Sequence, residues 1–486
     1  MSVLVRGGKR EGMVERPNNP EGESPEEKVR ELQRQLWTCA KRSRSRRFHA
    51  LYDRIWRGDV LLEAWRRVKA NGGAAGVDEV SIRDIEERGA GEYLKEIQNA
   101  LKAGRYRPSP VRRRYIPKGD GRQRPLGIPT VRDRVVQMAT KLVIEPIFEA
   151  DFQPCSWGFR PRRGATQAME VIREAGNRGH NWVLDADIRD YFGSIDHGKL
   201  MVLVKERISD RRVLKLIGQW LAAGVMEDGT MRETLAGTPQ GGVISPLLSN
   251  IYLGFLDRIW ENRCKHLGIL VRYADDYVVL CKSESQCKEA LRRVTIVMGR
   301  LGLEMHPEKT RMVSLARGKE GFTFLGWTVR KRRSIQRNPR WHFVQRWPSP
   351  KAMKRLRDRV HELTDVRGRQ ARDVEELIEK LNPVLRGWGN YFRTGNADRE
   401  FNQLDDYVYG RVLRWQWRRG GQRTRFRFDR WPRQRLHEMG LHRLMGTVRY
   451  PQAATPRKHG QENSSVSCVP ENGTHSLKGG AGNGSR

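Results

Sequence analysis

Segment 273–276, with the sequence Tyr-Ala-Asp-Asp, constrains the fold most, because it places two adjacent carboxylates between two strand-like runs. Residues 269–272 before it and 277–281 after it are mostly apolar or β-branched, and each run has about the length of a strand. The pattern predicts a hairpin with Asp275 and Asp276 at its tip. Neighbouring anions repel each other unless a cation lies between them, and carboxylate oxygens suit Mg²⁺. An ordinary Asp-rich turn is the alternative interpretation of this segment taken alone.

A second acidic segment supplies a further carboxylate. Residues 182–188 form a short apolar run with aspartates at alternate positions, so Asp185 and Asp187 face the same way on a strand. Three carboxylates from two strand segments are what two-metal nucleotidyl transfer requires, with the two ions roughly 3.5–4 Å apart. One ion lowers the pKa of the attacking hydroxyl, and the other holds the leaving pyrophosphate. Periodicity alone does not separate Asp185 from Asp187.

The acidic strand, the aromatic pair at 191–192 and the later Tyr-Ala-Asp-Asp together resemble the palm of a reverse transcriptase. Between them, residues 237–250 read locally as a tight loop before a helix. Their sequence, Gly-Thr-Pro-Gln-Gly-Gly-Val-Ile-Ser-Pro-Leu-Leu-Ser-Asn, is similar to the loop that lies against the incoming nucleotide in reverse transcriptases of bacterial group II introns. Other segments resemble this family in the same order: 116–118 and 124–129 its fingers, 156–161 the next block, 302–310 and 324–327 the blocks closing its palm, and 386–392 its splicing, or maturase, domain.

The resemblance, which covers roughly residues 50 to 450, implies an α+β right-hand polymerase. Its parts would be fingers, an antiparallel-sheet palm, an α-helical thumb and a basic C-terminal helical region. The basic stretch 331–350, interrupted by Trp and Pro, is interpreted as a linker or exposed loop, and helical periodicity follows over 351–405. We expect a mobile basic N-terminal extension at 1–45, the N-terminal block and fingers at 46–180, the palm with its catalytic carboxylates at 181–330, a linker and α-helical thumb or maturase domain at 331–405, an arginine-rich nucleic-acid-binding region at 406–450 and a disordered tail at 451–486.

The resemblance also gives roles to single residues. Asp187 and Asp275 become metal ligands, with Asp276 as the adjacent supporting carboxylate. In this family the aromatic gate lies five residues beyond the first ligand, and Phe192 lies five residues beyond Asp187. Phe192 would then pack against C2′ of the nucleotide and exclude a ribose hydroxyl by steric clash. Packing in the core is the alternative for Phe192.

Four more residues are expected near the nucleotide. Lys118 and Arg124 would be the cations that bind the triphosphate, and Gln240 would lie against the nucleotide or the template. Lys309 stands where the family has a lysine near the leaving pyrophosphate. For Lys309, a general-acid role and a plain surface lysine are both open.

The charge of the chain points to a polyanionic partner. Lysines and arginines number 93 against 57 acidic residues, a formal net charge of +36. Such an excess favours binding to nucleic acid, which releases counterions. Residues 411–450 hold twelve arginines, no lysine and two acidic residues, interleaved with aromatics that provide stacking surfaces. Arg411, Arg414, Arg418 and Arg419 are the expected nucleic-acid contacts, and an amphipathic helix with a solvated arginine face is the alternative.

Several classes of protein are disfavoured. The six cysteines are scattered without a Cys-x-x-Cys pair, which indicates neither a zinc site nor a disulfide framework. No apolar run approaches the ~18 residues of a membrane span. We therefore expect a bacterial cytoplasmic protein bound to RNA or nucleoid DNA, without contact to a membrane. The sequence gives no indication of the oligomeric state.

These observations predict an RNA-directed DNA polymerase of a group II intron that also assists splicing. It would use two Mg²⁺ ions and dNTPs, with intron RNA as template and splicing substrate and a DNA target or primer. The alternatives are an RNA-binding maturase with a decayed polymerase site, a retron-type or defence-associated reverse transcriptase, and an RNA-templated RNA polymerase. The intact carboxylates argue against decay, segment 386–392 favours the intron family, and Phe192 disfavours an RNA polymerase. We expect no C-terminal His-Asn-His nuclease domain after Tyr450, so that integration would need a primer made by something else.

Overall fold

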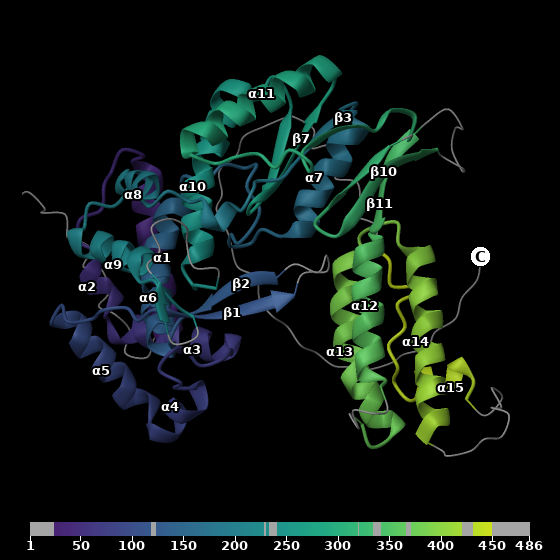
Figure 1. The fold of residues 1–486 in the computed structure, drawn as a ribbon, viewed down its shortest axis with the longest axis horizontal. Coiled ribbons are helices and arrows are strands. Elements are labelled where there is room, and N and C mark those ends of the chain that lie inside the picture. The colour runs from purple at the N-terminus through teal and green to yellow at the C-terminus, as the bar shows by residue number, and fades with distance from the viewer. Residues whose placement is uncertain are drawn as a thin grey trace, which may run out of the picture. The chain divides into compact units, whose positions relative to one another are not determined.

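The computed structural model describes residues 24–117, 123–227, 230–232, 241–318, 320–333, 342–365, 371–419 and 431–449. The expected tail at 451–486 therefore lies outside the described residues. The elements that build the N-terminal part are α1 (Pro25–Arg42), α2 (Tyr52–Ile55), α3 (Gly58–Asn71), α4 (Ile82–Arg88), α5 (Ala90–Lys102), β1 (Val111–Pro117), β2 (Gln123–Ile128) and α6 (Val131–Glu149) (Figure 1).

Helix α1 belongs to the folded core. It begins with a capping box in which the Ser24 backbone N–H donates to the Glu27 carboxylate at 2.8 Å and the Ser24 hydroxyl accepts from the Glu27 backbone N–H. Its apolar stripe packs against α6 and α3. Val29, Leu32, Leu36 and Ala40 are buried there. The expectation of a mobile extension over 1–45 is therefore wrong from Ser24 onward, and residues 1–23 lie outside the described residues.

A small sheet joins two distant parts of the chain. Strands β1 and β2 pair antiparallel, and β1 also pairs in parallel with β4 (Val225–Glu227). Strand β4 pairs with β5 (Thr230–Arg232), which gives the order β2-β1-β4-β5. The segment expected to form the fingers is thereby held beside the chain that leads toward residues 237–250.

The acidic segments meet in a four-stranded antiparallel sheet with the order β6-β7-β3-β8. Its strands are β3 (Trp182–Ala186), β6 (Ile269–Tyr273), β7 (Asp276–Cys281) and β8 (Arg311–Ser314). Alternate residues of β7 enter two different cores, because successive side chains of a strand point to opposite faces. Helix α11 (Glu284–Leu301) contacts β3 and β7, and α7 (Ala165–Asn177) contacts β6 and β7 (Figure 1). The expected antiparallel sheet with two acidic segments is present.

Further elements surround this sheet. They are the 3₁₀ turns at Tyr191–Gly193 and Ala316–Gly318, α8 (His197–Lys205), α9 (Arg211–Ala222), α10 (Ser245–Ile259) and a π-helical turn at Trp260–Cys264.

A second antiparallel sheet replaces the expected linker. Its order is β11-β10-β9, with β9 (Gly321–Phe324), β10 (Trp327–Arg333) and β11 (His342–Pro348). Two of its basic side chains are buried because they have polar partners far away in the sequence. Lys331 Nζ donates to Asn181 Oδ1 at 2.6 Å, and Arg346 Nη2 lies 3.0 Å from Glu170 Oε2. The basic composition of 331–350 suggested solvent exposure, but the described residues 331–333 and 342–348 are strand, and the expected boundary at 330/331 cuts β10.

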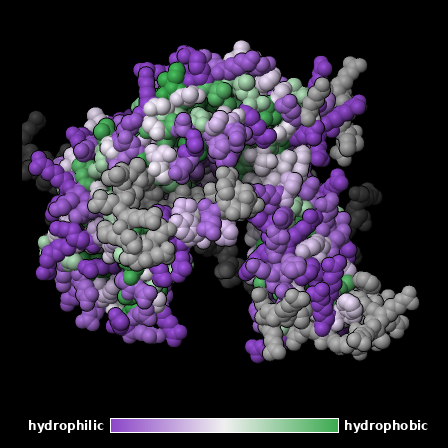
Figure 2. Space-filling view, in the orientation of Figure 1, coloured by the Kyte–Doolittle hydropathy of each residue, from purple (hydrophilic) through white to green (hydrophobic). Residues whose placement is uncertain are grey.

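The C-terminal part is helical. It contains α12 (Pro350–Leu363), α13 (Val374–Phe392), α14 (Asp398–Arg419) and α15 (Arg433–Glu438). Helix α12 contacts both α13 and α14. Figure 2 shows that hydrophilic residues cover much of the visible surface of these helices. Helix α14 continues across the expected boundary at 405/406, so the first arginines of the basic region stand on a helix of the same bundle. Within the described ranges, none of the helices has the length and apolarity that crossing a bilayer requires.

Candidate active site

The hairpin predicted from segment 273–276 is present. Strands β6 and β7 pair from Ile269 with Leu280 to Tyr273 with Asp276, which leaves Ala274 and Asp275 as a two-residue turn. Ala274 has a φ of 58°, in the left-handed region that a non-glycine residue adopts at a cost of about 1–3 kcal/mol. The surrounding structure must hold this turn in place.

Asp187 lies next to the hairpin. In the β3–β7 register Asp185 pairs with Val278 and Ala186 with Tyr277, so one further step places Asp187 opposite Asp276. Asp185, Asp187 and Asp276 line one cavity of about 630 Å³, whereas Asp275 stands in the adjacent turn. The two acidic segments therefore meet as expected from the sequence.

Two basic side chains form ion pairs with Asp185 and Asp187. Lys309 Nζ is 2.6 Å from Asp187 Oδ2, and Arg311 Nε is 3.0 Å from Asp185 Oδ2. Arg311 is also the cross-strand partner of Asp185 in the β3–β8 register, so this ion pair ties the sheet together. Burial raises the pKa of the Asp185 carboxyl, with Asp187 adding to the shift and Arg311 opposing it. Lys309 lines the same cavity as Asp187.

The segment around Lys309 is held by the backbone of the acidic strand. His306 N donates to the Asp187 carbonyl at 2.8 Å, and Arg189 N donates to the Glu304 carbonyl at 2.9 Å. These two bonds fix residues 304–306 beside the end of β3. The ion pair between Lys309 and Asp187 therefore joins two segments whose backbones already touch.

Phe192 lies in the short turn after Asp187. It is partly buried and packs against the larger core, and its ring centroid is 5.1 Å from that of Tyr191 in an edge-on arrangement. Tyr191 is buried, and its hydroxyl bonds Ser249 Oγ at 2.9 Å. Burial raises the pKa of the Tyr191 phenol, with the Asp275 charge contributing.

A buried arginine that sequence reasoning missed supports the hairpin. Arg272 is fully buried on β6, and its Nη1 donates to the Ala274 carbonyl at 2.8 Å and to Asn250 Oδ1 at 3.0 Å. Its Nε donates to Asp257 Oδ1 at 2.8 Å, and its Nη2 donates to Ser156 Oγ at 2.7 Å. Arg272 thus ties the strained turn to α10 and to the segment around Ser156. The one signal in the sequence is an arginine inside an otherwise apolar strand.

A glycine packs directly on the same turn. A Cβ atom added to Gly158 would lie 2.4 Å from Ala274 N and 2.9 Å from the Tyr273 carbonyl carbon. The Gly158 carbonyl accepts from Asn250 Nδ2 at 2.8 Å. Only a residue without a side chain leaves room for the backbone of the hairpin at this position.

The expected nucleotide-binding residues are described only in part. Lys118 and Gln240 lie outside the described residues, and for Arg124 only the backbone, in β2, is described. The residue after Gln240 packs against β2, because a Cβ on Gly241 would lie 2.4 Å from the Gly127 carbonyl oxygen. The described end of segment 237–250 therefore adjoins the strand that carries Arg124.

The arginines of α14 divide into two groups. Arg411 is buried, with Nε donating to Thr364 Oγ1 at 2.8 Å, and burial lowers its pKa. It ties α14 to the end of α12, which corrects the expectation that it contacts nucleic acid. Arg414 and Arg418 are exposed one helical turn apart. For Arg419 only the backbone is described.

The carboxylates of Asp187, Asp275 and Asp276 offer the hard oxygen donors that Mg²⁺ prefers, so the donor chemistry fits a divalent ion. The described residues contain no group of three His, Cys, Asp or Glu side chains already gathered around one ion position. The Lys309 ammonium bound to Asp187 shows that this end of the cavity accepts positive charge.

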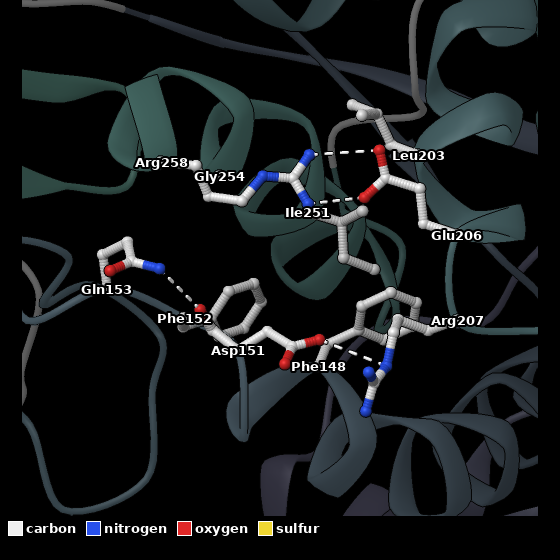
Figure 3. Close-up of a pocket in the computed structure, with 10 residues that line it drawn as sticks. All are labelled: Phe148, Asp151, Phe152, Gln153, Leu203, Glu206, Arg207, Ile251, Gly254 and Arg258. Atoms are coloured by element: carbon white, nitrogen blue, oxygen red, sulfur yellow. Dashed lines mark hydrogen bonds and ion pairs between the residues drawn. The ribbon is translucent and has the colours of Figure 1, made fainter. Parts of the chain in front are cut away.

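A second pocket, between α6, α8 and α10, has a structural role (Figure 3). Its volume is only about 30 Å³, and its charged residues pair with one another, Arg207 with Asp151 at 3.2 Å and Arg258 with Glu206. Arg207 also donates to the Ala40 carbonyl at 2.9 Å and so caps the end of α1. Arg207 therefore joins the wall of this pocket to the end of α1.

Two protein families match this chain. The family described as "Reverse transcriptase (RNA-dependent DNA polymerase)" matches residues 116–329, and the family described as "Group II intron, maturase-specific domain" matches residues 353–436. Protein YkfC of Escherichia coli K12 is 36% identical in an alignment that covers 63% of this chain and 89% of that protein. The group II intron-encoded protein LtrA of Lactococcus lactis subsp. cremoris is 30% identical in an alignment that covers 74% of this chain and 73% of that protein.

Among solved structures, a chain of the "Partial Cas6-RT-Cas1--Cas2 complex" matches at 23% identity. The match covers 51% of this chain and 42% of that chain with a TM-score of 0.32, which is too low to establish a shared architecture.

Proposed function

Since this chain belongs to the family of group II intron reverse transcriptases and maturases, we propose that Asp187, Asp275 and Asp276 form the catalytic centre of its RNA-directed DNA polymerase. The observation that carries this proposal is the register of β3 against β7, which brings Asp187 beside the hairpin. Two Mg²⁺ ions held by these carboxylates would activate the primer 3′-hydroxyl and stabilise the leaving pyrophosphate.

Asp185 has a different role in this proposal. Both Asp185 and Asp187 line the cavity, but Asp185 is paired across the strands with Arg311. This ion pair fixes the edge of the sheet, and Asp187 lies beyond the last strand residue, next to the hairpin. The position of Asp187 beside the hairpin supports its role as the metal ligand in this proposal.

Lys309 would serve the phosphate chemistry from within the same cavity. Its ammonium group lies within 2.6 Å of Asp187, so it can neutralise charge on a phosphate group that approaches this carboxylate. As a general acid it would donate its proton to the oxygen of the leaving pyrophosphate. Phe192 stays the proposed gate against ribonucleotides, and Lys118, Arg124 and Gln240 stay the proposed contacts of the incoming nucleotide.

The groove beside the carboxylates is proposed to hold the end of the primer. Its lining continues from Asp187 to Gly326 and to Lys351 and Arg355 on α12. The two basic side chains lie in the first turns of α12 and suit phosphate oxygens. In these terms the β6-β7-β3-β8 sheet is the palm, β1 and β2 belong to the fingers, and α12–α14 form the thumb.

Intron RNA is proposed to bind the helical C-terminal part. The maturase-specific match spans α12 to the start of α15, and this match favours the intron family over a retron-type enzyme. Arg414, Trp417 and Arg418 are exposed on α14 and combine phosphate contacts with a stacking surface. The protein would act on RNA and DNA in the bacterial cytoplasm.

The polymerase assignment is tested by primer extension with the full chain. Mg²⁺-dependent incorporation of dNTPs on an RNA template is expected, and Asp275→Asn should abolish it while leaving RNA affinity nearly unchanged. Activity retained by this variant would overturn the assignment of the hairpin.

A further inference from the structure

The guanidinium group of Arg272 uses every one of its hydrogen-bond donors. An arginine carries five N–H groups in one rigid plane. Nε and Nη2 donate to the two carboxylate oxygens of Asp257, and Nη2 also donates to Ser156 Oγ at 2.7 Å. Nη1 donates to Asn250 Oδ1 at 3.0 Å and to the Ala274 carbonyl at 2.8 Å. Because all of these donors are engaged and the side chain is fully buried, the group is held in a single orientation.

Asn250, on α10, joins the two contacts that enclose Ala274. Its side chain is 1% exposed, its Oδ1 accepts from Arg272, and its Nδ2 donates to the Gly158 carbonyl at 2.8 Å. Arg272 bonds the carbonyl of Ala274, and the backbone at Gly158 packs on the nitrogen of Ala274. One amide side chain therefore connects the groups that lie on both sides of the hairpin turn.

These contacts determine how the chain enters Asp275. A peptide unit is planar, so the Ala274 carbonyl oxygen lies in one plane with the nitrogen and the Cα atom of Asp275. The bond from Arg272 Nη1 to this oxygen therefore orients the peptide unit that leads into Asp275. Ala274 has a φ of 58°, and a non-glycine residue keeps this conformation only where its surroundings impose it. The position of the Asp275 backbone thus depends on Arg272 and, through Arg272, on Asn250.

We propose that Arg272 and Asn250 are positioning residues of the polymerase, which act through the Ala274 peptide to hold Asp275 in its productive place. This role rests on the proposed catalytic function of the hairpin. Neither residue is among the described residues that line the cavity with Asp187 and Asp276, so both act indirectly. The competing interpretation is a purely structural network that stabilises the core without setting the place of the turn.

A small displacement of the turn is enough to affect the reaction. Mg²⁺ requires near-octahedral coordination at about 2.0–2.1 Å, so a carboxylate that holds it tolerates little movement. A misplacement of about 1 Å can cost 10²-fold in rate. Loss of the positioning bonds should therefore slow the chemical step in protein that is still folded and still binds RNA.

The test uses the full chain with two single variants and the double variant. Asn250→Ala removes the bonds to Arg272 and Gly158 and leaves the ion pair of Arg272 with Asp257 in place. Arg272→Lys keeps a positive charge beside Asp257, but an ammonium group has three donors and no planar fork. If Arg272→Lys does not fold, Asn250→Ala decides the question alone.

Single-turnover extension of an annealed DNA primer on RNA separates the two interpretations. Its amplitude gives the fraction of active protein, and its rate constant gives the speed of the active molecules. We expect the rate constant to fall about tenfold in Asn250→Ala, the effect of one lost hydrogen bond, and about 10²-fold in Arg272→Lys. RNA affinity and the dNTP concentration for half-maximal rate should stay within about twofold of the parent.

Two further measurements show the route of the effect. Hydrogen exchange, followed without metal or substrate, should become faster at residues 273–276 in each variant. The double variant should extend about as slowly as Arg272→Lys, because residues that act through one chain of bonds are not additive.

Thr140→Val on α6 is the matched control. It removes a buried hydrogen bond that stays within α6, from Thr140 Oγ1 to the Val136 carbonyl at 2.9 Å. This variant should lower Tm without changing the rate constant or the hydrogen exchange at residues 273–276.

Two results would overturn the proposal. A rate constant equal to that of the parent in Asn250→Ala and in folded Arg272→Lys, with only amplitude or Tm lowered, would make the network purely structural. Multiplying effects in the double variant would show that Asn250 does not act through Arg272. Failure of the catalytic assignment looks different, because Asp275→Asn would then extend the primer at the rate of the parent.

Discussion

Lys309 places its Nζ 2.6 Å from Oδ2 of Asp187, so the proposed metal ligand and the proposed pyrophosphate cation form an ion pair in this structure. The two residues come from segments that are far apart in the sequence, and the backbone bond from His306 to Asp187 fixes one segment to the other. A divalent ion at Asp187 would share the carboxylate with this ammonium group. The pair therefore links the binding of metal to the position of Lys309.

The first prediction concerns this competition. In Lys309→Met the Asp187 carboxylate loses its ammonium partner, so half-saturating Mg²⁺ for extension should fall by about two- to fivefold. If Lys309 also protonates the leaving pyrophosphate, kcat should fall by about 10²-fold. The measurement is primer extension over a series of Mg²⁺ concentrations, together with Mn²⁺ binding followed by electron paramagnetic resonance. Arg311→Gln is the matched control, because its partner is Asp185. Unchanged Mg²⁺ dependence and unchanged kcat in Lys309→Met would make this residue a plain surface lysine.

The second prediction separates the two strand aspartates. Asp187→Asn should reduce extension by several orders of magnitude, whereas Asp185→Asn should retain most of the activity, because Asp185 pairs with Val278 inside β3 and Asp187 lies beyond the end of that strand, next to the hairpin. Both changes keep the shape of the side chain, so a difference in rate reports the charge at each position. Rates are compared at saturating template, primer and dNTP. An equal loss of extension rate in both variants would leave the choice of metal ligand between Asp185 and Asp187 open.

The third prediction concerns the support of the hairpin. Gly158→Ala would place a methyl group 2.4 Å from Ala274 N, so the turn that carries Asp275 must shift. A misplacement of about 1 Å can cost 10²-fold in rate, and we expect a loss of kcat of about that size with RNA affinity retained. Gly218→Ala on α9 is the control, since a Cβ there has no heavy atom within 4 Å. Full kcat in Gly158→Ala would show that the turn tolerates displacement.

The fourth prediction concerns the choice of sugar. Phe192→Val should open space beside the nucleotide and raise incorporation of rNTPs relative to dNTPs. The ratio of kcat/KM for matched rNTP and dNTP pairs measures the change. Phe192 also packs partly against the core, so thermal unfolding of the variant is followed in parallel. Lower stability with an unchanged ratio would make Phe192 a core residue and place the gate elsewhere.

The fifth prediction divides the arginines of α14. Replacing exposed Arg414 and Arg418 by Gln should flatten the salt dependence of RNA binding, with a loss in slope of about 0.7 per phosphate contact on single strands. Arg411→Gln should instead lower stability by about 1–3 kcal/mol, because it removes a buried bond to Thr364. Extension of a pre-annealed primer should survive in the exposed pair. If only Arg411→Gln lowered the salt slope, Arg411 would be the RNA contact, and Arg414 and Arg418 would not.

The features predictable from the sequence are the local ones. The hairpin and the acidic strand β3 follow from alternation and from charge beside apolar runs, and these signals need no distant partner. The network around Arg272 was not predictable, because its partners at Ser156, Asn250 and Asp257 lie on other elements.

Two errors had the same physical origin, since basic residues were taken as exposed. Lys331 and Arg346 are buried in a sheet. Lys331 donates a hydrogen bond to Asn181, and Arg346 forms an ion pair with Glu170. Arg411 stands three residues after Val408 and four before Trp415, both of which are buried. Helical spacing therefore placed it on the buried face of α14, and charge alone gave the opposite expectation.

The most direct test of the catalytic centre is single-turnover extension of a DNA primer on an RNA template by the full chain and by Asp275→Asn. RNA affinity is measured on the same preparations, so that loss of chemistry is separated from loss of binding. The parent protein should extend the primer in a Mg²⁺-dependent reaction, and the variant should bind RNA equally well but extend it several orders of magnitude more slowly. Extension by Asp275→Asn at the rate of the parent would contradict the proposed role of the hairpin.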